Sequence, residues 1–112
     1  MNKTINKVII LGFLEENPKT KNPSEGMSRS EFFLITENNL ENIPNNLKFT
    51  RHPMVAYGKK AEIIAQYATK DSLLYVEGFI RINENDAVEK YQVVVLDFQF
   101  IGGNPRNPLS KS

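Results

Sequence analysis

Apolar residues recur along the chain in short blocks, and five of these blocks have the length and spacing of β-strands. In Arg29–Glu37 the period is two, because Phe32 and Leu34 fall on one face of a strand while Phe33 and Ile35 fall on the other. The five predicted strands are Ile5–Glu15, Arg29–Glu37, Lys48–Tyr57, Leu73–Ile82 and Val88–Ile101. This pattern predicts an all-β domain.

One segment departs from the strand pattern. Lys59–Ala68 places four apolar residues at the i, i+3, i+4, i+7 spacing of an amphipathic helix of about three turns. The stretches 16–28, 38–46 and 83–87 are rich in Pro, Gly, Asn and Ser, which is typical of loops. The helix therefore falls between the third and fourth predicted strands.

The order of the predicted elements indicates a particular barrel. Five strands with one short helix between the third and the fourth are the arrangement of an OB-fold barrel, in which the helix caps the open end. The first half of Val88–Ile101 is apolar on both faces, as expected of a strand at the barrel closure. We predict a five-stranded OB-fold domain over residues 1–103 and a short disordered tail over 104–112.

Composition excludes several classes of chemistry. The chain has no cysteine, so zinc-thiolate sites, thiolate nucleophiles and disulfides are absent. His52 is the only histidine, and it shares a predicted face with Met54 and Ala56, which favours a packed or interface role over catalysis. We therefore predict a protein that is not an enzyme and that uses no metal and no cofactor.

Hydropathy and charge limit the possible cellular location and binding partners of the protein. The longest apolar runs are far below the roughly 20 residues that span a bilayer, and the N-terminus has no signal-peptide pattern. We therefore expect a soluble, cytoplasmic protein without a membrane partner or small-molecule substrate. The net charge is +1, so a polyanion site must come from local clustering of Lys and Arg.

The Gly-Lys-Lys at residues 58–60 is not a P-loop. It lacks the earlier glycine and the Ser or Thr that follows the lysine in that motif. Gly58 is better explained as the bend from strand to helix. Lys59 and Lys60 either contact an anionic partner or are solvated surface charges.

Two motifs follow each other in the middle of the chain, VAYGKKAE at residues 55–62 and SLLYVEG at 72–78. Together with INKVIILG at 5–12, FLIT at 33–36 and FIGG at 100–103, they resemble bacterial-type single-stranded DNA-binding proteins over nearly the whole chain. The resemblance implies an OB fold, sequence-tolerant binding of single-stranded DNA in replication, recombination or repair, and a homotetramer, with a dimer as the smaller possibility. The implied oligomer contacts are Ile5, Lys7, Ile9 and His52.

Binding of single strands without sequence preference requires aromatic faces for bases and cations for phosphates. Alternation places Phe79 and Arg81 on an outer face, opposite Ile80 and Ile82, which we expect to be buried. Phe33 and Phe49 serve either the DNA or subunit packing. The candidate DNA-binding residues are Phe33, Phe49, Arg51, Tyr57, Lys59, Lys60, Tyr75, Phe79 and Arg81.

The chain also departs from the family's pattern. It has no tryptophan, and Leu40, Arg51 and Asn85 stand where the family's stacking tryptophans align. Asp71 stands where glycine is usual, and Pro53 predicts a locally edge-like or bulged third strand. The sequence ends in a short, slightly basic stretch where the family carries an acidic tail that docks partner proteins, so either the sequence is truncated or this is a divergent member that does not recruit partners in that way.

These departures keep two alternatives open. The first is a primosomal-type OB protein that acts mainly through protein–protein contacts in replication restart. The second is an oligomeric OB scaffold that has lost nucleic-acid binding. The near-neutral charge and the missing tryptophans favour these alternatives, while the motifs at 55–78 do not separate them from the main prediction.

Overall fold

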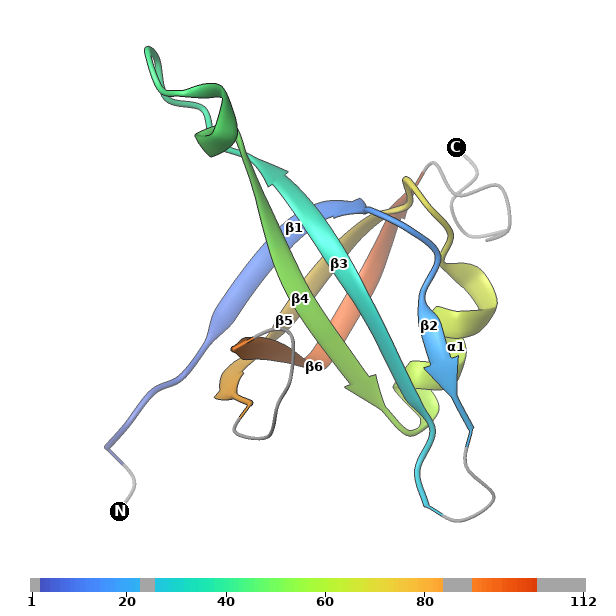
Figure 1. Cartoon of the computed structure of the whole chain (residues 1–112). Helices are drawn as coiled ribbons and strands as arrows, with labels where there is room; N and C mark the ends of the chain where they lie inside the picture. The colour runs from blue at the N-terminus through green and yellow to red at the C-terminus, as the bar shows by residue number, and fades with distance from the viewer. Residues whose placement is uncertain (1–2, 23–25, 84–89, 103–112) are drawn as a thin grey trace.

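The computed structural model describes residues 3–22, 26–83 and 90–102, which form a strand-rich barrel with one α-helix (Figure 1). The helices are α1 (Lys59–Tyr67) and the short 3-10 helix η1 (Asn45–Leu47). The strands are β1 (Val8–Leu14), β2 (Lys19–Lys21), β3 (Arg29–Glu37), β4 (Phe49–Tyr57), β5 (Leu73–Ile82) and β6 (Tyr91–Gly102).

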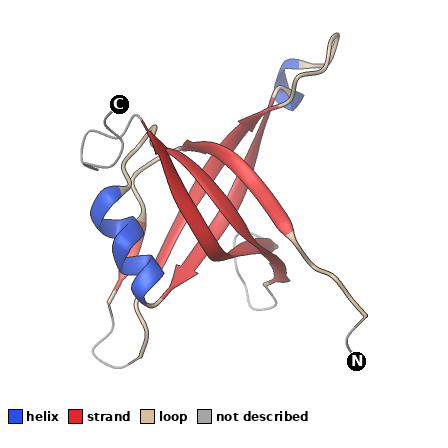
Figure 2. Cartoon of the chain, turned by 180° about the vertical axis from the view of Figure 1, so that it is seen from behind, coloured by secondary structure: helices blue, strands red, loops and turns tan. Residues whose placement is uncertain are grey.

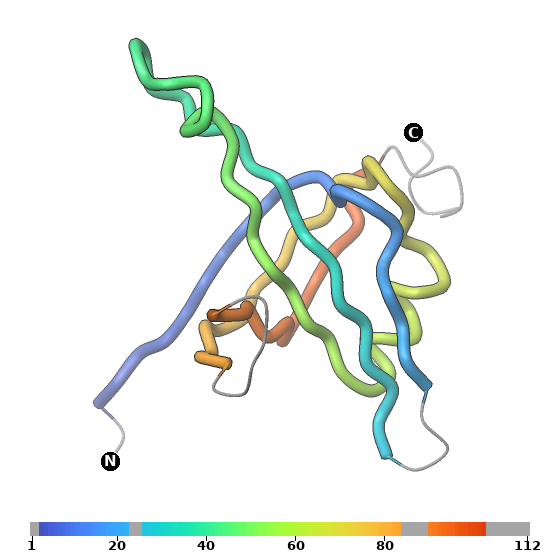
Figure 3. Tube along the Cα trace, in the orientation of Figure 1, coloured from blue at the N-terminus to red at the C-terminus, as the bar shows by residue number. Residues whose placement is uncertain are grey.

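The strands form one sheet that closes on itself. Its order is β1-β5-β6-β4-β3-β2, and a further antiparallel pairing of β1 with β3 makes five strands into a barrel with β2 alongside. The parallel pairing of Met54 with Val93 joins β4 to β6, and the pairing of Phe13 with Ile35 joins β1 to β3. The chain trace shows this closure, with the β3–β4 hairpin projecting beyond the barrel (Figure 3). The prediction of an all-β, OB-type barrel is confirmed.

The predicted boundaries agree with the structure where apolar alternation is strong. The strands predicted over 29–37 and 73–82 have those bounds, whereas β1 begins three residues later than predicted. The prediction missed β2, because Lys-Thr-Lys has no apolar position, and it missed η1 inside a polar loop. The predicted start of the last strand at Val88 and the predicted tail over 104–112 lie outside the described residues.

Alternation along the strands builds the core. The inward positions in the first two thirds of β3 and of β5 are buried, and they meet the apolar side of α1. The side chains with the largest volume among those almost fully buried are Leu14, Leu34, Met54, Ile64 and Leu74.

The helix covers one end of the barrel, as predicted (Figure 2). It begins after Gly58, whose φ of 67° turns the chain out of β4 and favours glycine. Small side chains, among them the buried Ala61, let the helix approach the sheet closely. The hydroxyl of the buried Ser30 on β3 donates a hydrogen bond of 2.9 Å to the carbonyl oxygen of Ala61. This bond ties α1 to the barrel wall.

Replacing Ser30 by alanine is expected to lower the free energy of unfolding by about 1–3 kcal/mol, because the buried carbonyl of Ala61 loses its side-chain donor. The measurement is urea unfolding at matched protein concentration. Ser28→Ala is the control, since the Ser28 hydroxyl bonds to Glu62 in solvent, and its effect should stay below about 0.5 kcal/mol. Equal effects of the two substitutions would contradict the tethering role of Ser30.

One sequence expectation about burial is wrong. Ile80 and Ile82 were expected to be buried, but they are 42% and 63% exposed. They point inward as predicted, and Ile80 pairs with Val93, but they lie at the end of the barrel that α1 does not cover. Val55 lies on the outward side of β4 yet is fully buried, because it is flanked by Glu31 on β3 and Val94 on β6.

Within the described residues, Pro53 lies at a point where β4 is paired with another strand on only one side. It pairs in regular register with Phe33 on β3, and the pairing of β4 with β6 begins only at Met54. The missing N–H of proline therefore falls at a point where, within the described residues, β4 pairs with β3 alone. The strand is locally edge-like there, as predicted.

Candidate functional site

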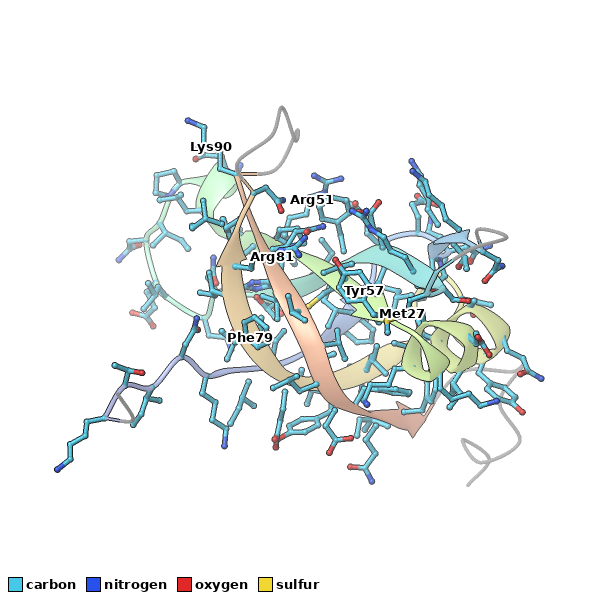
Figure 4. All side chains as sticks on the ribbon, turned by 90° about the horizontal axis from the view of Figure 1, so that it is seen from below. Met27, Arg51, Tyr57, Phe79, Arg81 and Lys90 are labelled. Atoms are coloured by element: carbon cyan, nitrogen blue, oxygen red, sulfur yellow. The ribbon has the colours of Figure 1, made fainter. Side chains whose placement is uncertain are left out.

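The outward sides of four neighbouring strands carry aromatic and arginine side chains together. In register, Arg29 on β3 lies opposite Tyr57 on β4, and Ile35 lies opposite Arg51. Across the β4–β6 pairing, Val94 continues the row to Phe79 on β5. Figure 4 labels Arg51 and Tyr57 on β4 and Phe79 and Arg81 on β5. We call this surface the aromatic–arginine face, and its residues are Arg29, Phe33, Arg51, Tyr57, Phe79 and Arg81.

A chain of polar contacts crosses the aromatic–arginine face. Arg29 pairs with Glu31 on the same strand, and the Gln92 amide on β6 donates to the same carboxylate oxygen at 3.4 Å. Arg81 on β5 in turn donates to the Gln92 amide oxygen at 3.0 Å. Gln92 is 7% exposed, so it is a buried polar group with both ends of its amide bonded. The contacts hold two arginines in place on opposite sides of β6.

A second cluster lies on the same face, where β1 ends next to β3. The Arg51 Nε lies 2.8 and 3.0 Å from the two carboxylate oxygens of Glu15. The guanidinium carbon of Arg51 sits 3.6 Å from the centre of the Phe33 ring. Arg51 is therefore held by an ion pair and a cation–π contact at once.

Sequence reasoning missed the residues that arrange these arginines. Glu15, Arg29, Glu31 and Gln92 carry no local signal, because each is a polar residue at the end of a strand or at one of its alternate positions. Only the pairing registers of the barrel bring them to the arginines.

The structure places Tyr75 away from the aromatic–arginine face. Its neighbours in register are Leu11 on β1 and Gln99 on β6. Its hydroxyl donates to the Glu77 carboxylate, and this hydrogen bond raises the pKa of Tyr75 above its usual value. Sequence alternation grouped Tyr75 with the other candidates, but the strand register does not place it beside them.

The remaining candidates flank the aromatic–arginine face. Phe49 is 60% exposed at the start of β4, opposite Glu37 and next to the projecting hairpin. Lys59 and Lys60 are exposed in the first turn of α1, and Lys59 lies 4.0 Å from the Glu62 carboxylate. Leu40 is exposed in the loop between β3 and β4. Asn85 lies outside the described residues.

Three of the four candidate oligomer contacts, Ile5, Lys7 and Ile9, lie on or just before β1. Ile5 is 91% exposed and Ile9 is 56% exposed, and Lys7 between them is exposed as well. The structure adds Leu11 and Phe13, each about half exposed, to the same side of the strand. Their spacing of two residues after Ile9 is the sequence signal that could have found them.

His52 lies on the inner side of the barrel with Met54, as predicted. Its Nε2 is 2.8 Å from the Thr36 hydroxyl, and burial lowers the pKa of His52 below its usual 6.5. It forms part of an open apolar pocket of about 460 Å³ at the barrel end away from α1. The pocket is lined by Val8, Ile10, His52, Ile80, Ile82, Tyr91 and Val93.

The lowered pKa of His52 predicts a pH dependence of stability. Between the lowered native pKa and the unfolded value of 6.5, the unfolded chain binds more protons than the folded one. The contribution of His52 to the free energy of unfolding should therefore be constant well above pH 6.5 and should fall as the pH drops through and below this value. The measurement is urea unfolding between pH 8 and pH 5.5 for the wild type and His52→Gln. If the wild type and the variant lost the same free energy of unfolding over this pH range, the assignment of the pH dependence to His52 would be contradicted.

Two kinds of site were sought in the described residues and not found. Over 3–22, 26–83 and 90–102, no group of three or more His, Asp or Glu side chains is placed to hold a metal ion. In the same ranges, no helix has the length and hydropathy needed to cross a membrane. Non-covalent contacts through the aromatic–arginine face are what this arrangement supports.

Comparison with known proteins gives consistent relatives. A profile of the Single-strand binding protein family matches residues 5–101. The Single-stranded DNA-binding protein of Xanthomonas campestris pv. campestris is 37% identical over 110 residues, covering 92% of this chain and 64% of that protein. Single-stranded DNA-binding protein 1 of Chlorobaculum tepidum is 31% identical over 110 residues, covering 91% and 68%. The Single-stranded DNA-binding protein of Neisseria meningitidis serogroup B is 30% identical over 112 residues, covering 93% and 64%. The chain thus spans slightly less than two thirds of the Xanthomonas and Neisseria relatives it matches.

Proposed function

Because this chain belongs to the Single-strand binding protein family, we propose that it binds single-stranded DNA with little sequence preference. Binding is non-covalent, without catalysis or a cofactor, and it serves DNA replication, recombination or repair in the cytoplasm. The relatives from Xanthomonas and Chlorobaculum carry this binding activity in their names. The observation that carries the proposal is the aromatic–arginine face, where Arg29 lies opposite Tyr57 and where Phe79 and Arg81 share the outward side of β5.

The proposed contacts divide between bases and phosphates. Tyr57 and Phe79 are partly exposed and stand on either side of the β4–β6 junction, so each offers a ring to a base. Each stacked base contributes roughly 1–3 kcal/mol and tolerates any sequence, because every base has a π-face. Arg29 and Arg81, together with Lys59 and Lys60 at the helix start, supply charge for the phosphates.

The polar contacts that link Arg29 to Arg81 are expected to limit the number of phosphate contacts. Glu31 already accepts from Arg29 and Gln92, so part of the positive charge is neutralised within the protein. With a net charge of only +1, we expect a salt dependence that reflects a few phosphate contacts rather than many. Stacking then provides the larger share of the affinity.

The test is a polarisation titration of a fluorescent oligo-dT of about 35 nucleotides, run at several salt concentrations against a duplex of the same length. Binding that strongly prefers the single strand and weakens with salt supports the proposal. The slope of log affinity against log salt reports the number of phosphate contacts, at about 0.7 per phosphate for single strands. A folded protein that leaves oligo-dT unbound at low salt would rule the function out.

The second part of the proposal is a homo-oligomer, a tetramer in preference to a dimer, that assembles through the first strand. Ile9, Leu11 and Phe13 leave a continuous apolar surface on β1, and surfaces of this kind mark protein contacts. Ile5, Lys7 and His52 are the further candidate contacts. Light scattering coupled to size-exclusion chromatography measures the mass directly, and Ile9→Lys should lower it. A monomer in the wild type would contradict the assembly.

A further inference from the structure

We infer that Gln92 is a positioning residue of the proposed DNA-binding surface: its buried amide holds Arg81 for a phosphate contact and leaves the charge of the guanidinium intact. The inference rests on the proposed function and deepens it, because it names the arginine of the aromatic–arginine face that contributes most to the salt dependence. Three observations support it: the chemistry of each arginine's partner, the fixed orientation of the Gln92 amide, and the free donors of Arg81 beside Phe79.

Two of the three arginines on the aromatic–arginine face are paired with carboxylates. Arg29 is paired with Glu31 on the same strand, and the Arg51 Nε lies 2.8 Å from a carboxylate oxygen of Glu15. An ion pair leaves no net charge at either position, so a phosphate would have to compete with a carboxylate for the same donors. These two arginines are therefore expected to add little to the salt dependence of binding.

Arg81 is bonded to neutral groups instead. Its guanidinium donates to the amide oxygen of Gln92 at 3.0 Å and to that of Asn83 at 3.5 Å. Within residues 3–22, 26–83 and 90–102, no carboxylate lies at ion-pair distance from Arg81. An amide oxygen accepts a hydrogen bond but carries no formal charge. Arg81 is thus the arginine of this face whose full charge is available to a phosphate.

The Gln92 amide has only one orientation that satisfies both of its partners. An ionised carboxylate such as Glu31 only accepts hydrogen bonds, and a guanidinium such as Arg81 only donates them. The amide nitrogen therefore faces Glu31 at 3.4 Å, and the amide oxygen faces Arg81. Gln92 is 7% exposed and pairs with Arg81 in the register of β5 and β6, so the oxygen is held in place. This arrangement orients Arg81 without neutralising it.

The remaining donors of Arg81 are free for a ligand. Both of its hydrogen bonds come from Nη2, so within the described residues Nε and Nη1 donate to no protein group. The side chain is exposed, and it follows Phe79 by two residues on the outward side of β5, about 7 Å along the strand (Figure 4). A base stacked on Phe79 would therefore bring a phosphate of the same DNA strand to Arg81.

Exchanging the two kinds of partner tests the inference in both directions. Gln92→Glu puts a carboxylate beside Arg81, and Glu31→Gln puts an amide beside Arg29. We expect Gln92→Glu to reduce the slope of log affinity against log salt by about 0.7, the value of one phosphate contact with a single strand. This change weakens oligo-dT binding about five-fold at 0.1 M salt. We expect Glu31→Gln to increase the slope by about the same amount and to tighten binding.

A second background separates the charge of Gln92→Glu from its effect on packing. In Arg81→Gln, the further substitution Gln92→Glu should leave the salt slope unchanged, because the cation that it would neutralise is gone. Gln66→Glu on α1 and Glu16→Gln after β1 are matched controls at exposed positions, and their slopes should stay near that of the wild type.

Thermal melts establish which variants are folded. The Glu31 side chain is 36% exposed, so Glu31→Gln provides the test if Gln92→Glu does not fold. In that case an unchanged salt slope for Glu31→Gln would overturn the inference.

The outcomes separate the inference from the proposed function. Wild-type protein that fails to bind oligo-dT removes the proposed function itself. Wild-type protein that binds, with a folded Gln92→Glu that keeps the wild-type slope, overturns the role of Gln92 alone. Weaker binding at an unchanged slope has the same meaning, because it reports packing and not charge. A reduced slope for Gln92→Glu that is absent in the Arg81→Gln background, with an increased slope for Glu31→Gln, establishes the role.

Discussion

Replacing Tyr57 and Phe79 together by alanine is expected to weaken binding of oligo-dT by about 30-fold or more. Each ring stacks one base at roughly 1–3 kcal/mol, and the two sites lie on different strands, so their effects should nearly add. Neither ring is among the buried core residues, so the barrel should remain folded. The measurement is the polarisation titration at one fixed salt concentration, together with a thermal melt of each variant.

The matched controls keep the rings and change only the hydroxyl. Tyr57→Phe and Phe79→Tyr preserve both π-faces and should bind within about three-fold of the wild type. The salt slope of the double alanine variant should stay near the wild-type slope, because stacking releases no counterions. A folded double variant that binds like the wild type would place the bases on another surface.

Replacing Gly78 by alanine is expected to cost about 2–4 kcal/mol of unfolding free energy. A Cβ atom at this position would lie 2.0 Å from the Val94 carbonyl oxygen and 2.9 Å from its carbon, both in the backbone of β6. Gly78 stands next to the register shift between β5 and β6 after Glu77. The strands would have to separate at the centre of the barrel, since a backbone atom cannot turn aside as a side chain can.

Gly26→Ala is the comparison for this clash. A Cβ on Gly26 meets nothing within 4 Å, although its φ of 97° makes any side chain strained there. Its cost should therefore be the backbone term alone, on the order of 1 kcal/mol. Urea unfolding of both variants at equal protein concentration measures the difference. If Gly78→Ala were as mild as Gly26→Ala, the close approach of β5 to β6 would be wrong.

Much of the fold could be predicted because apolar alternation records burial. The bounds of β3 and β5 followed from it. The helix followed from the helical spacing of apolar residues over 59–68, one residue longer than α1, and the closure by β6 followed from apolar residues on both of its faces. Alternation shows which way a side chain points, but it does not show how deeply the side chain is buried. Ile80 and Ile82 point inward as predicted, yet they stay exposed because α1 covers only the other end of the barrel.

The outward position of several candidate residues could be predicted from the sequence, but the contacts that orient the arginines could not. Tyr57, Phe79 and Arg81 lie on the outward sides that alternation gave them. The partners that orient the arginines come from strands distant in sequence, such as Gln92 beside Arg81 and Glu15 beside Arg51. Such contacts depend on the pairing register, which a single sequence does not state. The same limitation explains why Tyr75 was grouped with residues it does not adjoin.

The account claims that single-stranded DNA lies along the aromatic–arginine face, and photocrosslinking tests this most directly. A bromodeoxyuridine-substituted oligo-dT is irradiated with the wild-type protein, and the crosslinked residues are identified by peptide mass spectrometry. We predict crosslinks at Tyr57 and Phe79, on β4 and β5, that an excess of unlabelled oligo-dT abolishes. Crosslinks confined to the β1 surface around Leu11 and Tyr75, or none from a folded protein at saturating oligonucleotide, would contradict the account.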